Sequence, residues 1–205
     1  MLTVNGDRDV VERQLGDGEL ACPSCGGVLG GWGEAVTRPV RQLDGDDERV
    51  TPRRSRCRAC GATHVLLPAR LLCRRADAGP VIGRALEENA AGAGHRKIAE
   101  LLERPVSTVR GWLRALGRNA GRVRERFTSL AASLVTDPPL PAAAGSPLAD
   151  AVAAVAAAAA AAAMVPGVGV VARWELAAAV TCGLLLAPSW PSWRATRAGV
   201  WAAAC

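Results

Sequence analysis

Two short cysteine pairs constrain this chain more than any other feature of its sequence. Cys22 and Cys25 form one C-x-x-C pair, and Cys57 and Cys60 form a second pair after a gap of 31 residues. Two such turns facing each other supply the four thiolates, at about 2.3 Å, that a tetrahedral zinc ion needs. We therefore expect a closed, structural Zn2+ site whose four sulfurs lie within about 4 Å of one another. Buried or redox-active thiols are the alternative interpretation of the same residues.

The 31-residue gap between the pairs predicts a β-structure around the metal site. It is longer than the spacing of about 15–20 residues in common zinc sites, so a hairpin or loop must fill it. We expect strands over residues 32–40 and 49–57 around the polar turn 44–48, then a buried strand over 63–68. The glycine after each second cysteine suits a turn that needs φ > 0. His64 is expected to pack beside the site, with a role as a replacement ligand as the alternative.

Positive charge is concentrated in the middle third of the chain. The net charge is +6, and 24 of the 25 basic residues are arginines. Residues 61–128 carry 13 basic and 6 acidic side chains, a net charge of +7, whereas residues 1–60 carry 9 and 10, a net charge of −1. This distribution is typical of a local phosphate-binding surface. A coding bias toward arginine is the alternative for any single one of them.

The sequence becomes helical from about residue 79. We expect helices over residues 80–91, 95–102, 105–116 and 119–135, with the second and third forming a helix-turn-helix. In that motif the early, outward residues of the later helix read base edges in the major groove, and nearby arginines hold phosphates. The candidate DNA-binding residues are Ser107, Thr108, Arg110, Gly111 and Arg114 for the bases, and Arg118, Arg122 and Arg124 for the phosphates.

Alanine dominates the last third of the chain. A proline-rich linker over residues 136–147 precedes two expected helices, from Pro147 to about Met164 and from Arg173 to Ala187. Residues 151–172 carry no charge, but alanine drives membrane insertion poorly and Pro166 and two glycines interrupt the run. We expect soluble helices that pack on each other or on a second copy of the chain, so a homodimer stays open and a membrane partner is disfavoured.

The sequence lacks the residues that several classes of function require. No nucleophile has a paired histidine, and no glycine-rich phosphate loop is present, so we expect neither an enzyme nor a small-molecule substrate. The odd count of seven cysteines fits a reducing cytoplasm, and the acidic N-terminus is not a signal peptide. The expected divisions are an N-terminal segment (1–18), a zinc ribbon (19–78), a helix-turn-helix domain (79–135), a linker (136–147) and a helical C-terminal region (148–205).

The order of these motifs resembles an uncharacterised family of small bacterial proteins. Its members combine a zinc ribbon with a helix-turn-helix and look like the N-terminal DNA-binding parts of insertion-sequence transposases. The resemblance covers roughly residues 20–116, with a weaker similarity around Trp174 to Leu186. The matching residues are Cys22, Cys25, Trp32, Gly33, Arg56, Cys57, Cys60, Thr63, His64, Leu66, Leu67, Pro68, Arg74, Arg75 and Ser107 through Arg114. The resemblance implies DNA binding without transposase activity, because no catalytic domain is present.

Together these features predict an α+β chain: a small β zinc ribbon, an all-α helix-turn-helix domain and an α-helical C-terminal region. The predicted function is sequence-specific binding of double-stranded DNA, as a transcription regulator or a transposition-associated factor in the cytoplasm. The alternatives are a protein-interaction adaptor, in which the helix-turn-helix serves packing only, and an inactive transposase remnant.

Overall fold

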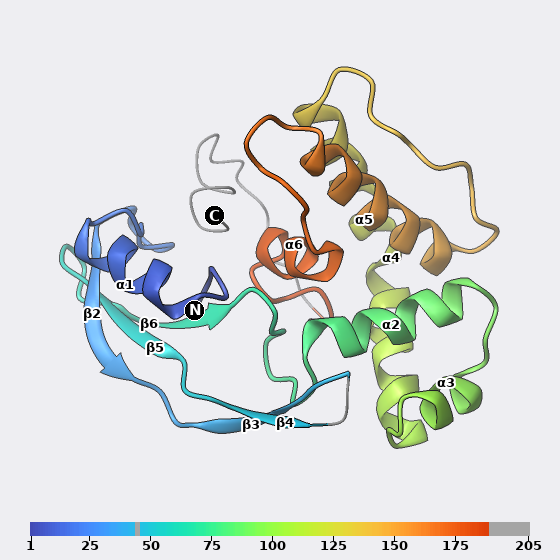
Figure 1. Ribbon diagram of the computed structural model, residues 1–205, viewed down its shortest axis with the longest axis horizontal. Coiled ribbons are helices and arrows are strands. Elements are labelled where there is room, and N and C mark those ends of the chain that lie inside the picture. Colours follow the sequence, from blue (N-terminus) through green and yellow to red (C-terminus); the bar gives the residue numbers. More distant parts are fainter. Residues whose placement is uncertain (44–45, 189–205) are drawn as a thin grey trace.

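The computed structural model describes residues 1–43 and 46–188, and this part is a mixed α+β fold. Figure 1 shows a strand-rich end joined to a group of helices. The strands are β1 (Leu2–Val4), β2 (Leu29–Glu34), β3 (Arg38–Arg41), β4 (Asp47–Val50), β5 (Arg53–Cys57) and β6 (Thr63–Pro68). The helices are α1 (Arg8–Gly16), α2 (Gly79–Ala90), α3 (His95–Leu101), α4 (Val106–Leu134), α5 (Pro147–Ala163) and α6 (Arg173–Val180).

The strand-rich end is built on a four-stranded sheet, here called the ribbon sheet, in the order β1-β6-β5-β2. β5 pairs antiparallel with β2 and β6, and β1 adds to β6 in parallel. One face packs against α1, where Val11 and Leu15 join Leu29 and Leu66 in a small core. The strand over 63–68 is therefore confirmed, whereas β1 had no counterpart among the expected strands.

The hairpin between the two cysteine pairs is longer and more divided than expected. Instead of two continuous strands over 32–40 and 49–57, β3 and β4 form a separate two-stranded sheet. The division falls at Pro52, which has no N–H to continue a ladder, although its carbonyl accepts from Ala35. Val40 and Val50 turn away from the ribbon sheet and join the core of the helices. The hairpin thus connects the two ends of the molecule (Figure 1).

The five helices α2–α6 form what we call the helical body. α3 and α4 are joined by a short turn at Leu102–Pro105, in which Glu103 has a positive φ of 52°. The two helices expected over 105–116 and 119–135 are a single helix, α4, which continues through Gly117. Leu116, Asn119 and Ala120 are buried on one side of α4, so packing keeps the helix continuous across the weak glycine position.

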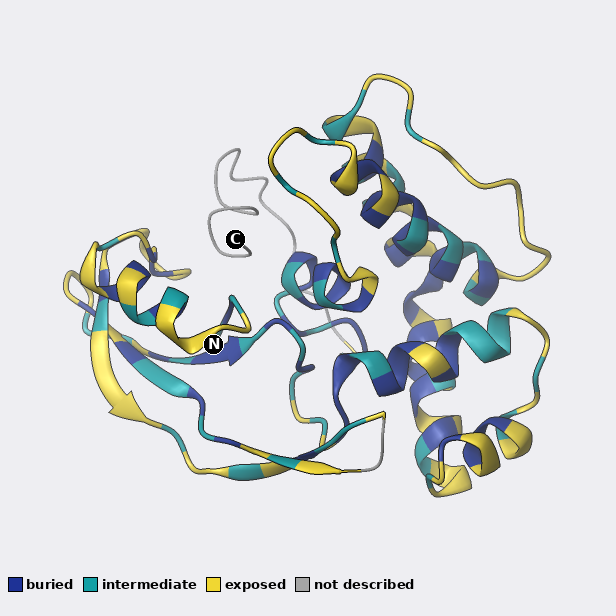
Figure 2. Cartoon of the chain, viewed as in Figure 1, coloured by how far each residue is buried: buried dark blue, intermediate teal, exposed yellow. Residues whose placement is uncertain are grey.

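The alanine-rich helices complete this core instead of standing apart from it. α5 packs along α4 and also contacts α2 and α6, and its buried alanines allow this close approach (Figure 2). Ser146 caps α5 as expected, since its hydroxyl accepts from the N–H of Ala149. α6 ends at Val180, short of Ala187, because Cys182 and Gly183 adopt positive φ angles that stop the helix.

Across the described segments, none of the helices is both long enough and apolar enough to cross a membrane. The three tryptophans and the cysteine of residues 190–205 lie outside the described part of the chain.

Candidate metal centre and exposed arginine ridge

The two cysteine pairs form turns with the same backbone geometry. The N–H of Gly26 donates to the carbonyl of Cys22, and the N–H of Gly61 donates to that of Cys57. These glycines have φ angles of 75° and 72°, so the expectation of left-handed glycines after each pair is confirmed. Each turn is closed by a second bond, from the N–H of its first cysteine back to the carbonyl of the residue five positions later. The strands therefore present two matching sulfur-bearing turns.

The four sulfurs converge on one point. All four Sγ atoms lie within 4.8 Å of one another, slightly wider than expected. The Sγ atoms of Cys25 and Cys57 are 3.5 Å apart, and those of Cys22 and Cys60 are 3.8 Å apart. These separations are well beyond a disulfide bond of about 2.05 Å, and all four cysteines are free. The cluster could therefore hold a metal ion.

The ionisation of these thiols also fits a cation. The N–H of Cys60, acting against burial, lowers the pKa of the Cys57 thiol to about 6. Burial raises the pKa of Cys22, but hydrogen bonds from the backbone of Ser24 and Cys25 outweigh it and lower the pKa to about 7. For Cys25 the N–H of Gly27 lowers the pKa, yet the neighbouring sulfurs raise it to about 12. Four sulfurs this close cannot all ionise unless a positive charge sits among them.

His64 lies beside the cluster as the sequence suggested. It is buried on β6, and its Nε2 is 3.4 Å from the Sγ of Cys22. Its Nδ1 lies 3.4 Å from the N-terminal nitrogen of Met1. Four cysteine sulfurs would suffice for a tetrahedral ion without it, and the histidine is placed to orient the Cys22 sulfur.

Six of the eight candidate DNA-binding residues lie along one exposed side of α4. Four arginines at successive spacings of four residues form what we call the arginine ridge: Arg110, Arg114, Arg118 and Arg122. Ser107 and Gly111 lie beside its first turn and are also exposed. The opposite side of α4 is buried through Val109, Trp112 and Leu116. The helix therefore separates an apolar face from a strongly basic one.

The other two candidates lie off this ridge. Thr108 is half-buried. Arg124 points toward α5, where its Nη1 lies 3.7 Å from Oδ2 of Asp150. Nearby Arg126 also turns inward, and its Nη2 donates to the carbonyl of Val180 at 3.1 Å.

Three glycines lie among the ridge arginines, and no close contact within the described chain requires a glycine at these positions. Gly111, Gly117 and Gly121 are exposed within α4, and apart from the adjoining backbone of the helix itself, a Cβ on any of them would meet no described atom within 4 Å. Glycine inside a helix costs about 0.5–1 kcal/mol relative to alanine. Packing within the described part of the chain therefore does not explain why these three positions between the arginines carry no side chain.

A buried ion-pair network holds the α3–α4 turn to the hairpin, and sequence reasoning missed it. Asp77 is 3% exposed and accepts from Arg104 Nε at 2.7 Å and from Arg41 Nη2 at 3.1 Å. Arg104 also donates to the carbonyl of Gln42 at 3.0 Å. From the sequence, Arg104 only replaces an apolar residue common in helix-turn-helix turns. Its partners are remote in the sequence, so no local signal could have found them.

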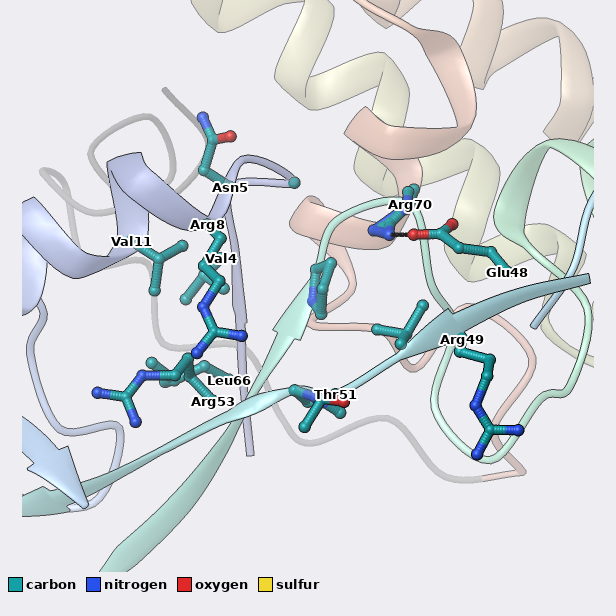
Figure 3. A pocket seen from close by; sticks show the side chains of 14 residues that line it. Val4, Asn5, Arg8, Val11, Glu48, Arg49, Thr51, Arg53, Leu66 and Arg70 are labelled. Atoms are coloured by element: carbon teal, nitrogen blue, oxygen red, sulfur yellow. Dashed lines mark hydrogen bonds and ion pairs between the residues drawn. The ribbon is translucent and has the colours of Figure 1, made fainter. Parts of the chain in front are cut away.

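A cavity of about 170 Å³ lies between the start of α1 and the β4–β5 connection (Figure 3). Three of the four arginines around it already have carboxylate partners: Arg8 pairs with Glu34, Arg53 with Glu12 and Arg70 with Glu48. Because these charges are neutralised within the chain, we assign no ligand to this cavity.

Comparison with known proteins places part of the chain in a described family model. Residues 22–112 match the family model described as "Domain of unknown function (DUF6431)". The matched segment begins at the first cysteine and ends at Trp112 in α4, so it spans both cysteine turns, the hairpin, α2 and α3. It covers less than half of the chain and excludes α5 and α6. No curated protein and no solved structure matches this chain. The matched family model thus includes both the cysteine cluster and the α3–α4 pair. It gives no function and no relationship to a transposase.

Proposed function

We propose that this protein binds double-stranded DNA through the exposed face of α4, with a structural zinc ion in the ribbon sheet. The observation that carries the proposal is the arginine ridge. None of its four guanidinium groups has a hydrogen bond or an ion pair with any residue that the structure describes. By contrast, Arg84 of α2 and Arg173 of α6 are exposed but paired with glutamates.

A ridge of this kind is unfavourable without a partner. Like charges four residues apart on a helix destabilise it by about 0.2–0.5 kcal/mol per pair. α4 contains six arginines and a single acidic residue, Glu125. The four ridge residues extend over roughly 18 Å of helix axis, at about 1.5 Å per residue. A row of phosphates would neutralise them and release bound counterions, which is the main source of affinity for DNA.

The residues of the ridge divide by their place along the helix. Ser107, Arg110 and Arg114 belong to the first turns after the α3–α4 turn, the part of a recognition helix that reaches base edges. Arg118 and Arg122 follow and hold phosphates, which position a protein without specifying sequence. The glycines beside them let the DNA backbone come close to the helix.

The zinc ion would stabilise the fold and take no part in chemistry. Four cysteine sulfurs fill a tetrahedral shell and leave no open position for water or substrate. We propose that the protein is not an enzyme, and that the metal anchors the strands from which the hairpin extends to the α3–α4 turn. A transcription regulator and a transposition-associated factor would use this surface in the same way.

A titration of labelled duplexes with the zinc-loaded full chain tests this proposal. Arg110→Ala is expected to cost about 1–3 kcal/mol and to relax specificity at one base position. Arg122→Ala is expected to weaken all sequences alike and to lower the salt slope by about one unit. Arg13→Ala is the matched control, because Arg13 is exposed on α1, away from α4.

Two outcomes would reject DNA binding by α4. One is the absence of binding to any duplex at low salt by the folded, zinc-loaded protein. The other is an equal loss of DNA affinity in Arg110→Ala and Arg13→Ala. Affinity would then depend on the net charge of the protein and not on the position of the arginine. The first result would favour the protein-interaction adaptor, and the second would leave only nonspecific attraction between a basic protein and DNA.

A further inference from the structure

The arginines on and beside the ribbon sheet fall into two groups according to the face of the sheet they occupy. On the side of α1, Arg8 and Arg53 are paired with Glu34 and Glu12. On the other side, Arg54, Arg56 and Arg58 have no carboxylate partner in the described part of the chain. The pairing register confirms the division, since Arg56 lies directly between Gly30 of β2 and Thr63 of β6. One face of the sheet is therefore covered by α1, and its arginines are paired. The other face is buried against the helical body at β1 and β6, where Leu67 joins the helical core, and is open and basic only along β5 and β2.

Trp32 lies on the same open face. It is 51% exposed, and the guanidinium carbon of Arg56 lies 4.7 Å from its ring centroid. β2 is one of the two edge strands of the sheet, and its pairing with β5 shifts register between Gly31 and Glu34. Bulges at sheet edges commonly re-aim a side chain. The irregularity here holds a large aromatic ring in solvent beside an arginine, where the ring contributes nothing to either core.

Glycines beside the Trp32 ring leave room above the sheet, because they have no side chains. A Cβ on Gly30 would lie 3.4 Å from Nε of Arg58, so this arginine extends across the glycine. Arg56 Nε donates to the carbonyl of Gly61 at 3.3 Å, which fixes its plane while its terminal nitrogens stay available. The result is a basic surface, which we call the open sheet face, formed by the exposed Trp32, Arg56 and Arg58 and by the half-buried Arg54 at its border.

We infer that the open sheet face binds single-stranded nucleic acid. The exposed side of the Trp32 ring stacks on an unpaired base, and the three arginines contact the phosphates on either side of that base. Stacking on an aromatic ring combined with a basic surface is how sequence-tolerant single-strand binders work. A duplex offers phosphates but no free base face, so the tryptophan selects the single strand. This site is separate from α4 and does not depend on the function proposed for that helix.

Fluorescence anisotropy with a labelled 12-nucleotide oligothymidine and the zinc-loaded full chain tests this inference. Trp32→Ala is expected to weaken binding about tenfold or more, because a stacked base is lost. Trp32→Phe should keep most of the affinity. Arg58→Ala should reduce affinity and lower the salt slope by about 0.7. Arg13→Ala serves as the control for loss of one positive charge outside the open sheet face.

The same variants distinguish this site from α4. Arg114→Ala is expected to reduce duplex binding and leave oligothymidine binding unchanged, whereas Trp32→Ala should do the reverse. The inference is overturned if the folded wild-type protein does not bind oligothymidine, or if Trp32→Ala behaves like Arg13→Ala. It is also overturned if polyglutamate of equal charge competes as well as an unlabelled oligonucleotide, since the face would then recognise charge alone.

Discussion

The ribbon sheet and the helical body are stabilised in different ways. Among the described residues, the core of the ribbon sheet contains eight buried side chains, and two of them are the cysteines Cys22 and Cys57. The core of the helical body contains thirty-six, including large ones such as Trp112 and Phe127. A core as small as the first seldom folds without a disulfide or a metal. From this comparison we expect a bound metal to be needed for folding of the ribbon sheet but not of the helical body.

The hairpin β3–β4 complicates this division. Its strands continue from the strands that carry the cysteine turns, yet Val40 and Val50 are buried among the helices. The Asp77 network adds a polar connection between the hairpin and the α3–α4 turn. The two ends are therefore supported differently but are not independent. The following predictions test whether each end stays folded when the other is destabilised, from the largest expected effect to the smallest.

The largest expected effect is that of Cys57→Ser. This change should remove the metal and unfold the ribbon sheet, because apparent binding energies of structural zinc are about 10–16 kcal/mol and are coupled to folding. The helical circular dichroism signal should remain largely intact. Elemental analysis and limited proteolysis of residues 1–70 provide the measurements. Cys73→Ser is the matched control, since this half-buried cysteine lies outside the cluster. Loss of the helical signal together with the metal would show that both ends unfold as one unit.

A smaller effect is expected when the polar connection is broken. Asp77→Ala leaves Arg104, whose side chain is only 12% exposed, without its carboxylate partner. Removing one member of a buried ion pair costs about 3–5 kcal/mol. Urea denaturation followed by circular dichroism should show this loss, and the hairpin should become sensitive to protease. Asp47→Ala, an exposed position on the same hairpin, should change stability little. Equal stability of the two variants would mean that Val40 and Val50 alone hold the hairpin to the helices.

The smallest changes in stability are expected for alanine substitutions at two glycines of the helical body, one tightly packed and one exposed. A Cβ on Gly83 of α2 would overlap the indole of Trp174 in α6, so Gly83→Ala should destabilise the protein by about 1–3 kcal/mol. Gly117→Ala on the open face of α4 should instead stabilise it by about 0.5–1 kcal/mol. Thermal denaturation of both variants gives the sign of each effect. A loss of stability in Gly117→Ala would show that this face is covered by another part of the protein.

Much of the local structure could be predicted because its causes are local. The spacing of the cysteines, together with a glycine after each pair, was enough to predict the cluster and its positive φ angles. Pro80 and the pair Ser146–Pro147 mark the starts of α2 and α5, because proline and a hydroxyl cap act on adjacent backbone groups. The mixed α+β class and the strand over 63–68 followed in the same way. The metal ion, DNA binding and the division into domains remain predictions.

What the tertiary structure decided depends on residues far apart in the sequence. β1 is a strand because Leu2–Val4 finds an open edge at β6, more than sixty residues later. α4 passes through Gly117 because Leu116 and Ala120 are both buried, and packing on that face outweighs a propensity cost of about 1 kcal/mol. Arg104 acquires a role only when Asp77 and Gln42 are brought to it. The sequence alone determined which residues form the cysteine cluster and the basic face of α4. Folding determined which arginines are neutralised by carboxylates and which stay available, because ion pairing depends on distances that only the assembled chain defines.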